Sequence, residues 1–561
     1  MATDPLVEAG LLDLGVDDTS TQRDHIPPFM RWREHVDPPK RQTTYLSAFP
    51  SPSLESDIPS TKSSACFVHA LPSELILSIF NLLTHDIISD GVRTYFSPAW
   101  TRVGLVCTRW RELALCTSFL WPRISFAHSA LATTMLARAG DTPIEILYGD
   151  VLARRLDPAV SLVLAGVTRL ARLDILIPRA LLPSFRESLS GTKSDLERVN
   201  ISIVDRPADS HDSILDATRA QRLRSLVLDG APLSPSADLF VDFGSLHELS
   251  MERFVPPMRW SSTQMTYLLA HTRSLRLLVL KDVLRVEDEE DSRGSEPQSS
   301  PAHNFSLPEL RQLSIHAPTS AIATLIAHAD LPPTSTACTI SLVCAARTPS
   351  DCALSRCVPR GLRGGAIARM DVHVHITAFR VAFYTDAVAN APALELALSP
   401  SRSLPYSYRT GVESLRDFCG FSDTGHSDPG THVTSLDLSS LRTLELDCDN
   451  ALYLVALIDV LQMFGRACPA LDVLVLSRVA FQAFQDARPC DVGMFDGALG
   501  RYYSHVKRVV VRGMRVEEAE AVTGAVRACF PAAEEAVVQG QVMVIARQAE
   551  CSIFPSQQEA E

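Results

Sequence analysis

The chain has 561 residues, of which 46% are hydrophobic and 21% are charged, and its formal net charge at pH 7 is −13. This length accommodates two or more domains or one long repeat array, and the composition is that of a soluble globular protein. The acidic balance argues against broad binding to phosphate backbones, so we expect no nucleic-acid partner. We expect no membrane partner and a cytoplasmic or nuclear location, because the N-terminus resembles no secretory signal and no apolar run reaches spanning length.

Thirteen cysteines are scattered along the chain without the spacing of a metal site. The closest pairs are Cys338 with Cys344 and Cys352 with Cys357, and no His-x3–5-His spacing follows them. We therefore expect buried thiols in a reducing compartment, and neither a metal nor a cofactor.

The N-terminal segment, residues 1–63, is predicted to be a disordered tail. From Ile26 to Ser63 it is dense in proline, serine and charge, with no sustained apolar period. Such a composition buries too little apolar surface to offset the entropy of ordering.

Two short amphipathic helices are predicted between Leu71 and Trp121. Pro72 suits the first helical position, and apolar residues follow at helical spacing on two adjoining stripes: Leu75, Ile79, Leu82 and Leu83, and then Ile76 and Phe80. A second start signal, Ser97-Pro98, precedes a further set: Val103, Val106, Trp110, Leu113 and Ala114. These apolar residues exceed what so small a unit can bury on itself, so we expect the segment to dock on a partner.

The same segment resembles the F-box, in the divergent form common among fungal F-box-like proteins. The matching residues are Leu71-Pro72, Glu74-Leu75, Ile79-Phe80, Val106-Cys107, Trp110-Arg111, Leu113-Ala114 and Leu120-Trp121. The segment from His85 to Tyr95 is longer than the family's usual connection. The resemblance implies a helical module over residues 64–126 that binds a Skp-family adaptor, and through it a cullin. The adaptor-facing residues would be Leu71, Pro72, Leu75, Ile79, Phe80, Leu105, Val106, Cys107, Trp110 and Trp121. An ordinary helical hairpin within a larger core is the alternative.

A leucine-rich pattern, with apolar residues at i, i+3 and i+5, recurs beyond residue 130. Apart from the interval between residues 310 and 441, where the pattern blurs, its starts are roughly 23 to 35 residues apart, near or above the range of leucine-rich repeats. The pattern begins at Leu170, Leu196, Leu223, Leu246, Leu275, Leu310, Leu441, Leu471 and Val506. Weaker strands are predicted over 337–344, 370–376 and 394–399, and helices over 262–271, 450–464 and 517–530. Mobile insertions are expected at 285–302, which is acidic, and at 400–430.

The alternation of strands and helices predicts the α/β class, with an irregular leucine-rich-repeat-like solenoid over residues 130–550. A non-repetitive α/β domain is the alternative. In each strand the leucines would face the core, and the residues between them would line an open face. That arrangement places candidate target-binding residues on one mixed, mildly acidic concave surface beside Lys281, Arg508 and Arg512: Asp229, Glu248, Glu252, Glu445 and Asp447.

No catalytic grouping is evident, so we expect that the chain is not an enzyme. His373 and His375 would share one strand face, and without a third ligand we interpret them as solvent-facing histidines and not as a metal site. The resemblance implies a substrate receptor of an SCF-type (Skp–cullin–F-box) ubiquitin ligase, which presents an unknown target protein for degradation. The alternative is a non-ligase interaction scaffold with a vestigial F-box-like segment.

Overall fold

The structure is a computed structural model. It describes residues 71–166, 169–190, 196–205, 222–231, 233, 243–256, 259–285, 304–332, 338–346, 357, 366–375, 378–386, 389, 392–400, 438–448, 460, 464, 468–481, 503–530, 532–538 and 541–544. The chain divides into two compact units, Met1–Pro72 and Ser73–Glu561, and the first contributes only its last two residues to this set. The predicted tail lies outside the described residues, as do both predicted insertions apart from Arg285 and Pro400.

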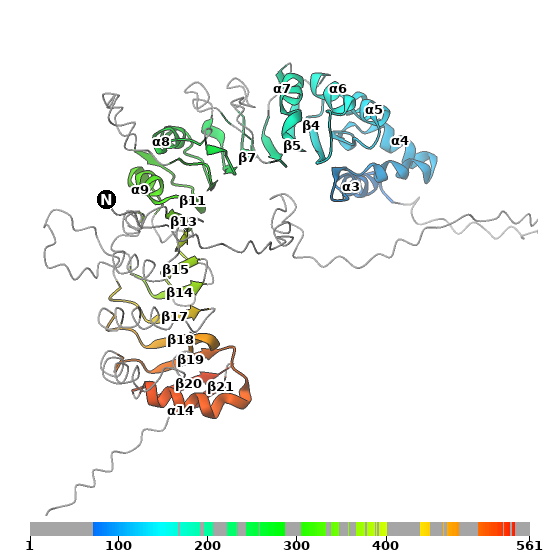
Figure 1. Ribbon diagram of the computed structural model, residues 1–561. Coiled ribbons are helices and arrows are strands. Elements are labelled where there is room, and N and C mark those ends of the chain that lie inside the picture. The colour runs from blue at the N-terminus through cyan, green and yellow to red at the C-terminus, as the bar shows by residue number, and fades with distance from the viewer. Residues whose placement is uncertain are drawn as a thin grey trace, which may run out of the picture. The chain divides into compact units, whose positions relative to one another are not determined.

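The described helices fall along the second unit in chain order (Figure 1). The α-helices are α3 (Ser73–Thr84), α4 (Thr108–Cys116), α5 (Ser129–Ala139), α6 (Pro158–Gly166), α7 (Leu182–Ser190), α8 (Ser262–Ala270), α9 (Thr319–His328) and α14 (Ala519–Cys529). The 3-10 helices are η1 (Pro98–Leu105), η2 (Ser118–Leu120), η3 (Arg179–Leu181), η6 (Phe243–Ser245) and η12 (Val516–Glu518).

The strands of the first half are β1 (Ile87–Ser89), β2 (Arg93–Phe96), β3 (Arg123–Ile124), β4 (Ile144–Asp150), β5 (Leu170–Ile177), β6 (Arg198–Ile203), β7 (Ser225–Asp229), β8 (Glu248–Glu252), β9 (Leu277–Lys281), β10 (Phe305–Ser306), β11 (Gln312–Pro318) and β12 (Ala329–Asp330). Those of the second half are β13 (Thr339–Ala346), β14 (Arg369–His375), β15 (Ala378–Tyr384), β16 (Leu394–Pro400), β17 (Thr443–Cys448), β18 (Val473–Ser477), β19 (Arg508–Arg512), β20 (Glu535–Val538) and β21 (Gln541–Val544).

Within the described ranges, 19 strands form one mostly parallel sheet, and β10 pairs with β12 apart from it. Strands β4 to β9 pair in parallel in chain order, and β11 and β13 extend the series. The order then reverses, because β13 pairs with β16, which is followed by β15 and β14 in antiparallel pairing. Strand β14 pairs in parallel with β17, and the parallel series continues to β20. One antiparallel strand, β15, thus interrupts a sheet whose other central strands all run the same way.

The nine predicted leucine-pattern strands are confirmed as strands of this sheet, and every apolar residue of their patterns is at most 2% exposed. The patterns lie in register: Leu173 pairs with Val199, which pairs with Leu226, and the row continues through Leu249 and Leu278. In-register apolar rows form a continuous core under the sheet, which fixes the register because a one-residue slip would turn each row outward. Strands at the three weaker predictions are also present, as β13, β14 and β16.

Helices line one face of this sheet (Figure 1), where α9 contacts β11 and β13 and α14 contacts β20. The helix predicted over 262–271 is α8, and Ser261 and Gln264 form a capping box at its N-terminus. The helix predicted over 517–530 is α14, whereas only Val460 and Phe464 of the one predicted over 450–464 are described. Strands and helices alternate as predicted, and a true repeat solenoid stays a prediction.

A left-handed residue follows several strands directly. Gly230, Arg253 and Asp282, with φ angles of 69°, 58° and 55°, come immediately after β7, β8 and β9, and Gly513, with φ of 77°, follows β19. The backbone N–H groups of the first three donate to carbonyls of the neighbouring strand segments, Gly230 to Glu252, for example. The same turn therefore ends successive strands, although only two of these positions are glycine, the residue that adopts positive φ at no steric cost.

Candidate functional site

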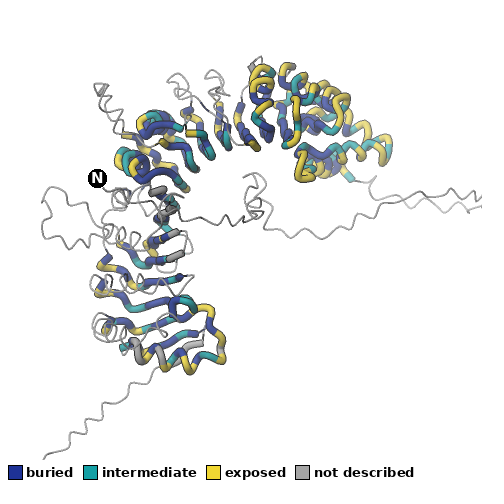
Figure 2. The backbone as a smooth tube through the Cα atoms, in the orientation of Figure 1, coloured by how far each residue is buried: buried dark blue, intermediate teal, exposed yellow. Residues whose placement is uncertain are grey.

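Helix α3 has two apolar stripes, and the structure separates them by burial. Ile76, Phe80 and Thr84 are fully buried, while Leu75, Ile79 and Leu82 are 52%, 42% and 73% exposed. Both stripes have helical spacing, so the periodicity alone does not tell which one faces the core. The core below α3 is filled by Ile76 and Phe80, and the Leu75 stripe stays exposed. The backbone tube of α3 accordingly has both buried and exposed residues along its length (Figure 2).

Aromatic residues form the core of this module. The Phe80 and Trp110 rings meet edge to face with centroids 5.1 Å apart, and those of Trp100 and Trp121 do the same at 4.8 Å. Trp121 Nε1 donates to the carbonyl of Ala114 at 2.8 Å. These contacts hold α3, η1 and α4 together, because each aromatic pair joins two different segments.

Two of the residues that were predicted to face an adaptor are buried in the structure. Phe80 is 0% exposed and Trp121 is 5% exposed, so the prediction that these side chains face a partner is wrong. Both belong to the motif that resembles the F-box, and a motif residue can be required for the core as well as for a contact surface. Of the remaining candidates, Leu71, Cys107 and Trp110 are half-buried.

The other predicted adaptor-facing residues lie on an uncovered surface. Among the described residues, nine of the twelve exposed large apolar side chains lie between Leu75 and Phe119. We call these nine the apolar surface: Leu75, Ile79, Leu82, Leu83, Val92, Leu105, Val106, Leu115 and Phe119. The sequence prediction left five of them off its site, although Leu82 and Leu83 lie at helical spacing from Leu75. Leu75, Ile79 and Leu82 share one face of α3, and an exposed apolar stripe of this kind marks an interaction site.

The long segment from His85 to Tyr95, for which no structure was predicted, forms the hairpin β1–β2. Its turn contains Asp90-Gly91, with Gly91 at a φ of 87°, and Asp90 Oδ1 accepts hydrogen bonds from the N–H groups of Arg93 and Val92. These two bonds hold the pKa of Asp90 below its usual value. An Asp-Gly pair between two short β-prone runs is a recognised hairpin signal and could have predicted this element.

The hairpin connects the helical module to the large sheet. Strand β2 pairs antiparallel with β4, where Thr94 lies opposite Gly149, and β3 pairs in parallel with an earlier part of β4. Arg123 adds a side-chain link, since Nη1 donates to Thr84 Oγ1 at 2.7 Å and Nη2 lies 3.2 Å from Glu145 Oε1. Backbone pairing covers the edge of β4, which would otherwise be open to other chains.

The five candidate target-binding residues fall into two groups on the helix-free face of the sheet. Glu248, Asp229 and Glu252 lie on β7 and β8, whereas Glu445 and Asp447 lie on β17. The two groups are separated by six described strands: β9, β11, β13, β16, β15 and β14. The two groups of carboxylates therefore share one face of the sheet but do not form one site.

Most of these carboxylates already have cationic partners. Arg253 Nε donates to Asp229, and Lys281 Nζ lies 3.0 Å from Glu252 Oε1. Asp229 and Glu445 were predicted to line an open concave face, but they are only 4% and 8% exposed. The face is therefore charge-compensated and not simply acidic, because opposite charges alternate between neighbouring strands.

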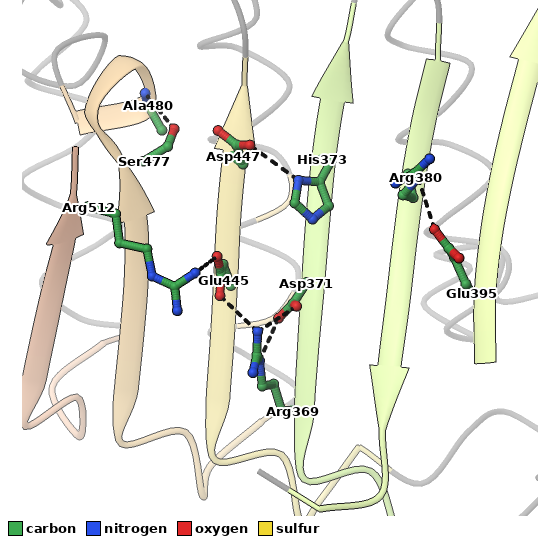
Figure 3. A network of polar contacts seen from close by, with 10 residues as sticks. All are labelled: Arg369, Asp371, His373, Arg380, Glu395, Glu445, Asp447, Ser477, Ala480 and Arg512. Carbon is green, nitrogen blue, oxygen red and sulfur yellow. Dashed lines mark hydrogen bonds and ion pairs between the residues drawn. The ribbon is translucent and has the colours of Figure 1, made fainter. Parts of the chain in front are cut away.

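The second group belongs to a polar network on β14, β17 and β19 (Figure 3). Arg369 donates to both oxygens of Asp371 at 2.8 and 2.7 Å and to Glu445 Oε2 at 3.0 Å, and Arg512 donates to the other Glu445 oxygen. His373 Nδ1 lies 3.3 Å from Asp447 Oδ2. Burial, together with repulsion from Asp371, raises the pKa of Glu445 despite the two arginines.

In the part of the chain that the structure describes, no group of three or more potential ligands could hold a metal ion. None of the described helices has the length and apolar character needed to cross a membrane. Burial raises the pKa of Cys338 to about 11 and that of Cys468 to about 12, so these two thiols stay protonated at neutral pH and are poor nucleophiles.

The F-box-like family matches residues 68–127, the segment that carries the apolar surface, the aromatic core and the hairpin. The chain therefore contains an F-box-like domain. Such domains are typically non-enzymatic adaptors that bind Skp1-type partners, which suggests a role in protein interaction of the ubiquitin-ligase type. No curated protein matches the chain.

Proposed function

We propose that this chain is the substrate-recognition subunit of an SCF-type ubiquitin ligase. The apolar surface would bind a Skp-family adaptor and through it a cullin, and the helix-free face of the sheet would bind the target protein. The observation that carries the proposal is the uncovered Leu75, Ile79 and Leu82 stripe within the F-box-like domain. Its aromatic core is complete, so this surface is available to another protein without unfolding the domain.

The receptor would make no bonds itself. Its contribution would be to hold a target lysine near the ligase, because tethering converts ubiquitin transfer into a nearly intramolecular reaction. Pairing between β2 and β4 supports this role, since it joins the F-box-like domain to the sheet by backbone hydrogen bonds. A firm connection keeps a target bound to the sheet within a limited range of positions.

We further propose that the sheet and its helices form a leucine-rich-repeat-like solenoid. The in-register apolar rows and the left-handed residue that follows β7, β8 and β9 support this interpretation, because a repeated unit should end each strand with the same turn. The reversed order of β14, β15 and β16 is the main irregularity.

The test is capture of the full chain by a recombinant Skp-family adaptor, comparing two double variants. The variant Leu75→Asp with Leu82→Asp alters the apolar surface, and Leu152→Asp with Leu162→Asp is its control, since these leucines are similarly exposed, at 71% and 57%, outside the F-box-like match. Burying a large apolar side chain contributes about 1.5–3 kcal/mol, so loss of two should weaken capture by roughly 100-fold or more. Undiminished capture of the first variant would refute the assignment of this surface.

A non-ligase scaffold with a vestigial F-box-like segment is the second candidate, and the segment from His85 to Tyr95 favours it, because this connection is longer than the family's usual one. Purification of the chain from its native cell distinguishes the two functions. The receptor should co-purify with both adaptor and cullin, whereas a scaffold should co-purify with neither.

A further inference from the structure

One row of side chains on the helix-free face changes from acidic to apolar across five strands. Its members lie in register: Asp371 on β14, Glu445 on β17, Val475 on β18, Val510 on β19 and Val537 on β20. The row therefore places two carboxylates beside three valines over adjacent strands.

The valines of this row face away from the helices. On β19 both neighbours of Val510, Val509 and Val511, are fully buried, while Val510 is only half-buried. Successive side chains of a strand point to opposite faces, so Val510 lies on the face opposite the core that Val522 and Val526 of α14 help to fill. Val510 and Val537 are half-buried on this face and can contact a partner, whereas Val475, beside Glu445, is only 5% exposed.

The two carboxylates have one largely buried and one exposed cationic partner. The Arg369 side chain is 20% exposed, makes three hydrogen bonds to Asp371 and Glu445, and lies over the Tyr384 ring with its guanidinium carbon 4.6 Å from the ring centroid. The Arg512 side chain is 58% exposed, and among the described residues its ion-pair partner is Glu445.

Arg512 reaches Glu445 across an intervening strand (Figure 3). In the strand pairing Arg512 lies opposite Ser477 on β18, and Glu445 lies on the far side of β18. Neighbouring strands are about 4.8 Å apart, so the Arg512 and Glu445 side chains together bridge roughly 10 Å across β18. A long, exposed side chain gains little free energy from an ion pair of this kind, because fixing its conformation costs side-chain entropy.

We propose that the row from Glu445 to Val537 binds a segment of the target protein that carries one arginine beside apolar residues. Until the target binds, Arg512 occupies the position of that arginine. The proposal rests on the proposed function, whose target it describes chemically. An arriving guanidinium replaces Arg512 on Glu445, so the buried carboxylate keeps two cationic partners throughout. Apolar side chains next to that arginine cover Val510 and Val537, and burying this apolar surface supplies the free energy that drives the exchange.

The charge balance of this face suits a basic partner. On β14, β17, β19 and β20 the carboxylates are Asp371, Glu445, Asp447 and Glu535, and the arginines are Arg369, Arg508 and Arg512. With His373 neutral, one negative charge is left over. The excess lies near Asp447, whose side chain is 46% exposed and pairs only with His373 among the contacts drawn in Figure 3. An acidic segment would meet repulsion here, so charge complementarity selects a basic one.

The experiment measures binding of a labelled pentapeptide, Arg-Ser-Leu-Ser-Leu, to the full chain by fluorescence anisotropy. Alternate residues of an extended peptide point to the same side, so its arginine and both leucines can face the row together. We expect Arg512→Gln to tighten binding roughly two- to fivefold, which is the effect of removing one competing exposed ion pair. We expect Val510→Ser to weaken it roughly fivefold through lost apolar contact.

Two controls make the result specific. Arg276→Gln removes an arginine of similar exposure from an ion pair elsewhere, with Glu309, and should leave binding unchanged. The peptide Glu-Ser-Leu-Ser-Leu should not bind. Unchanged or weaker binding by the Arg512→Gln variant would overturn the proposal, as would equal binding of the acidic peptide. Adaptor capture depends on the apolar surface and not on this row, so failure of the peptide experiment leaves the proposed function standing.

Discussion

The Phe80 ring lies edge to face with the Trp110 ring, with centroids 5.1 Å apart and planes at 68°, and this contact joins α3 to α4. Phe80 is fully buried, while Leu82, two residues further along α3, is 73% exposed. Two apolar residues of one helix therefore serve different purposes, one in the core and one on the apolar surface.

Replacement of Phe80 by alanine should destabilise the F-box-like domain by about 3–5 kcal/mol, because it opens a cavity beside Trp110. Leu82→Ala should change the free energy of unfolding by less than about 0.5 kcal/mol, as exposed substitutions usually do. Urea unfolding of the two variants measures the difference. Similar losses of stability in both would contradict the assignment of Leu82 to the surface.

Gly149 lies where the hairpin meets the sheet, and a larger residue there should separate them. A Cβ atom at this position would lie 3.1 Å from the Thr94 Cβ and 3.3 Å from the Leu176 Cβ. We expect Gly149→Val to cost about 1–3 kcal/mol through overpacking and to speed amide hydrogen exchange in β2. If β2 exchange stays as slow as in the wild type, the β2–β4 pairing is not what protects it.

Gly91 should be needed for the turn of the hairpin. Its φ of 87° is disfavoured for other residues, so Gly91→Ala should cost about 1–2 kcal/mol. Gly244→Ala is the matched control, since Gly244 has no positive φ and a Cβ there would meet nothing within 4 Å. Thermal unfolding of both variants tests the point, and an equal melting temperature would show that the turn tolerates alanine.

The pH dependence of stability should reveal the environment of Glu445. Its folded-state pKa is raised, first by burial and then by Asp371, so the folded chain binds this proton more tightly than the unfolded chain. The resulting stability is fully present below the unfolded pKa and is lost as pH rises through the folded one. The Glu445→Gln variant, which lacks this titration, should therefore gain stability relative to the wild type as pH rises from about 4 upward. Urea unfolding across that range checks the sign, and the opposite trend would mean that the two arginines outweigh burial.

The apolar patterns predicted the strands well because their consequence is local. Any strand whose alternate residues are leucine-like must turn them to the core, and the nine predicted strands all do so. The reversal at β14, β15 and β16 was not predicted, because apolar alternation is the same in parallel and antiparallel strands. The hairpin β1–β2 was not predicted either, because the expected module was wholly helical, although Asp90-Gly91 between two short β-prone runs is a hairpin signal.

By itself, the sequence determined that the N-terminal module has more apolar residues than it can bury and that leucine-patterned strands follow it, because both properties are set by residue spacing. Only the tertiary structure decided that Phe80 and Trp121 belong to the core while Leu75 and Leu82 stay exposed, and that Arg512 pairs with Glu445 across a strand. Spacing fixes which residues share a face. Which face is covered, and which charges meet, depends on neighbours that lie far away along the chain.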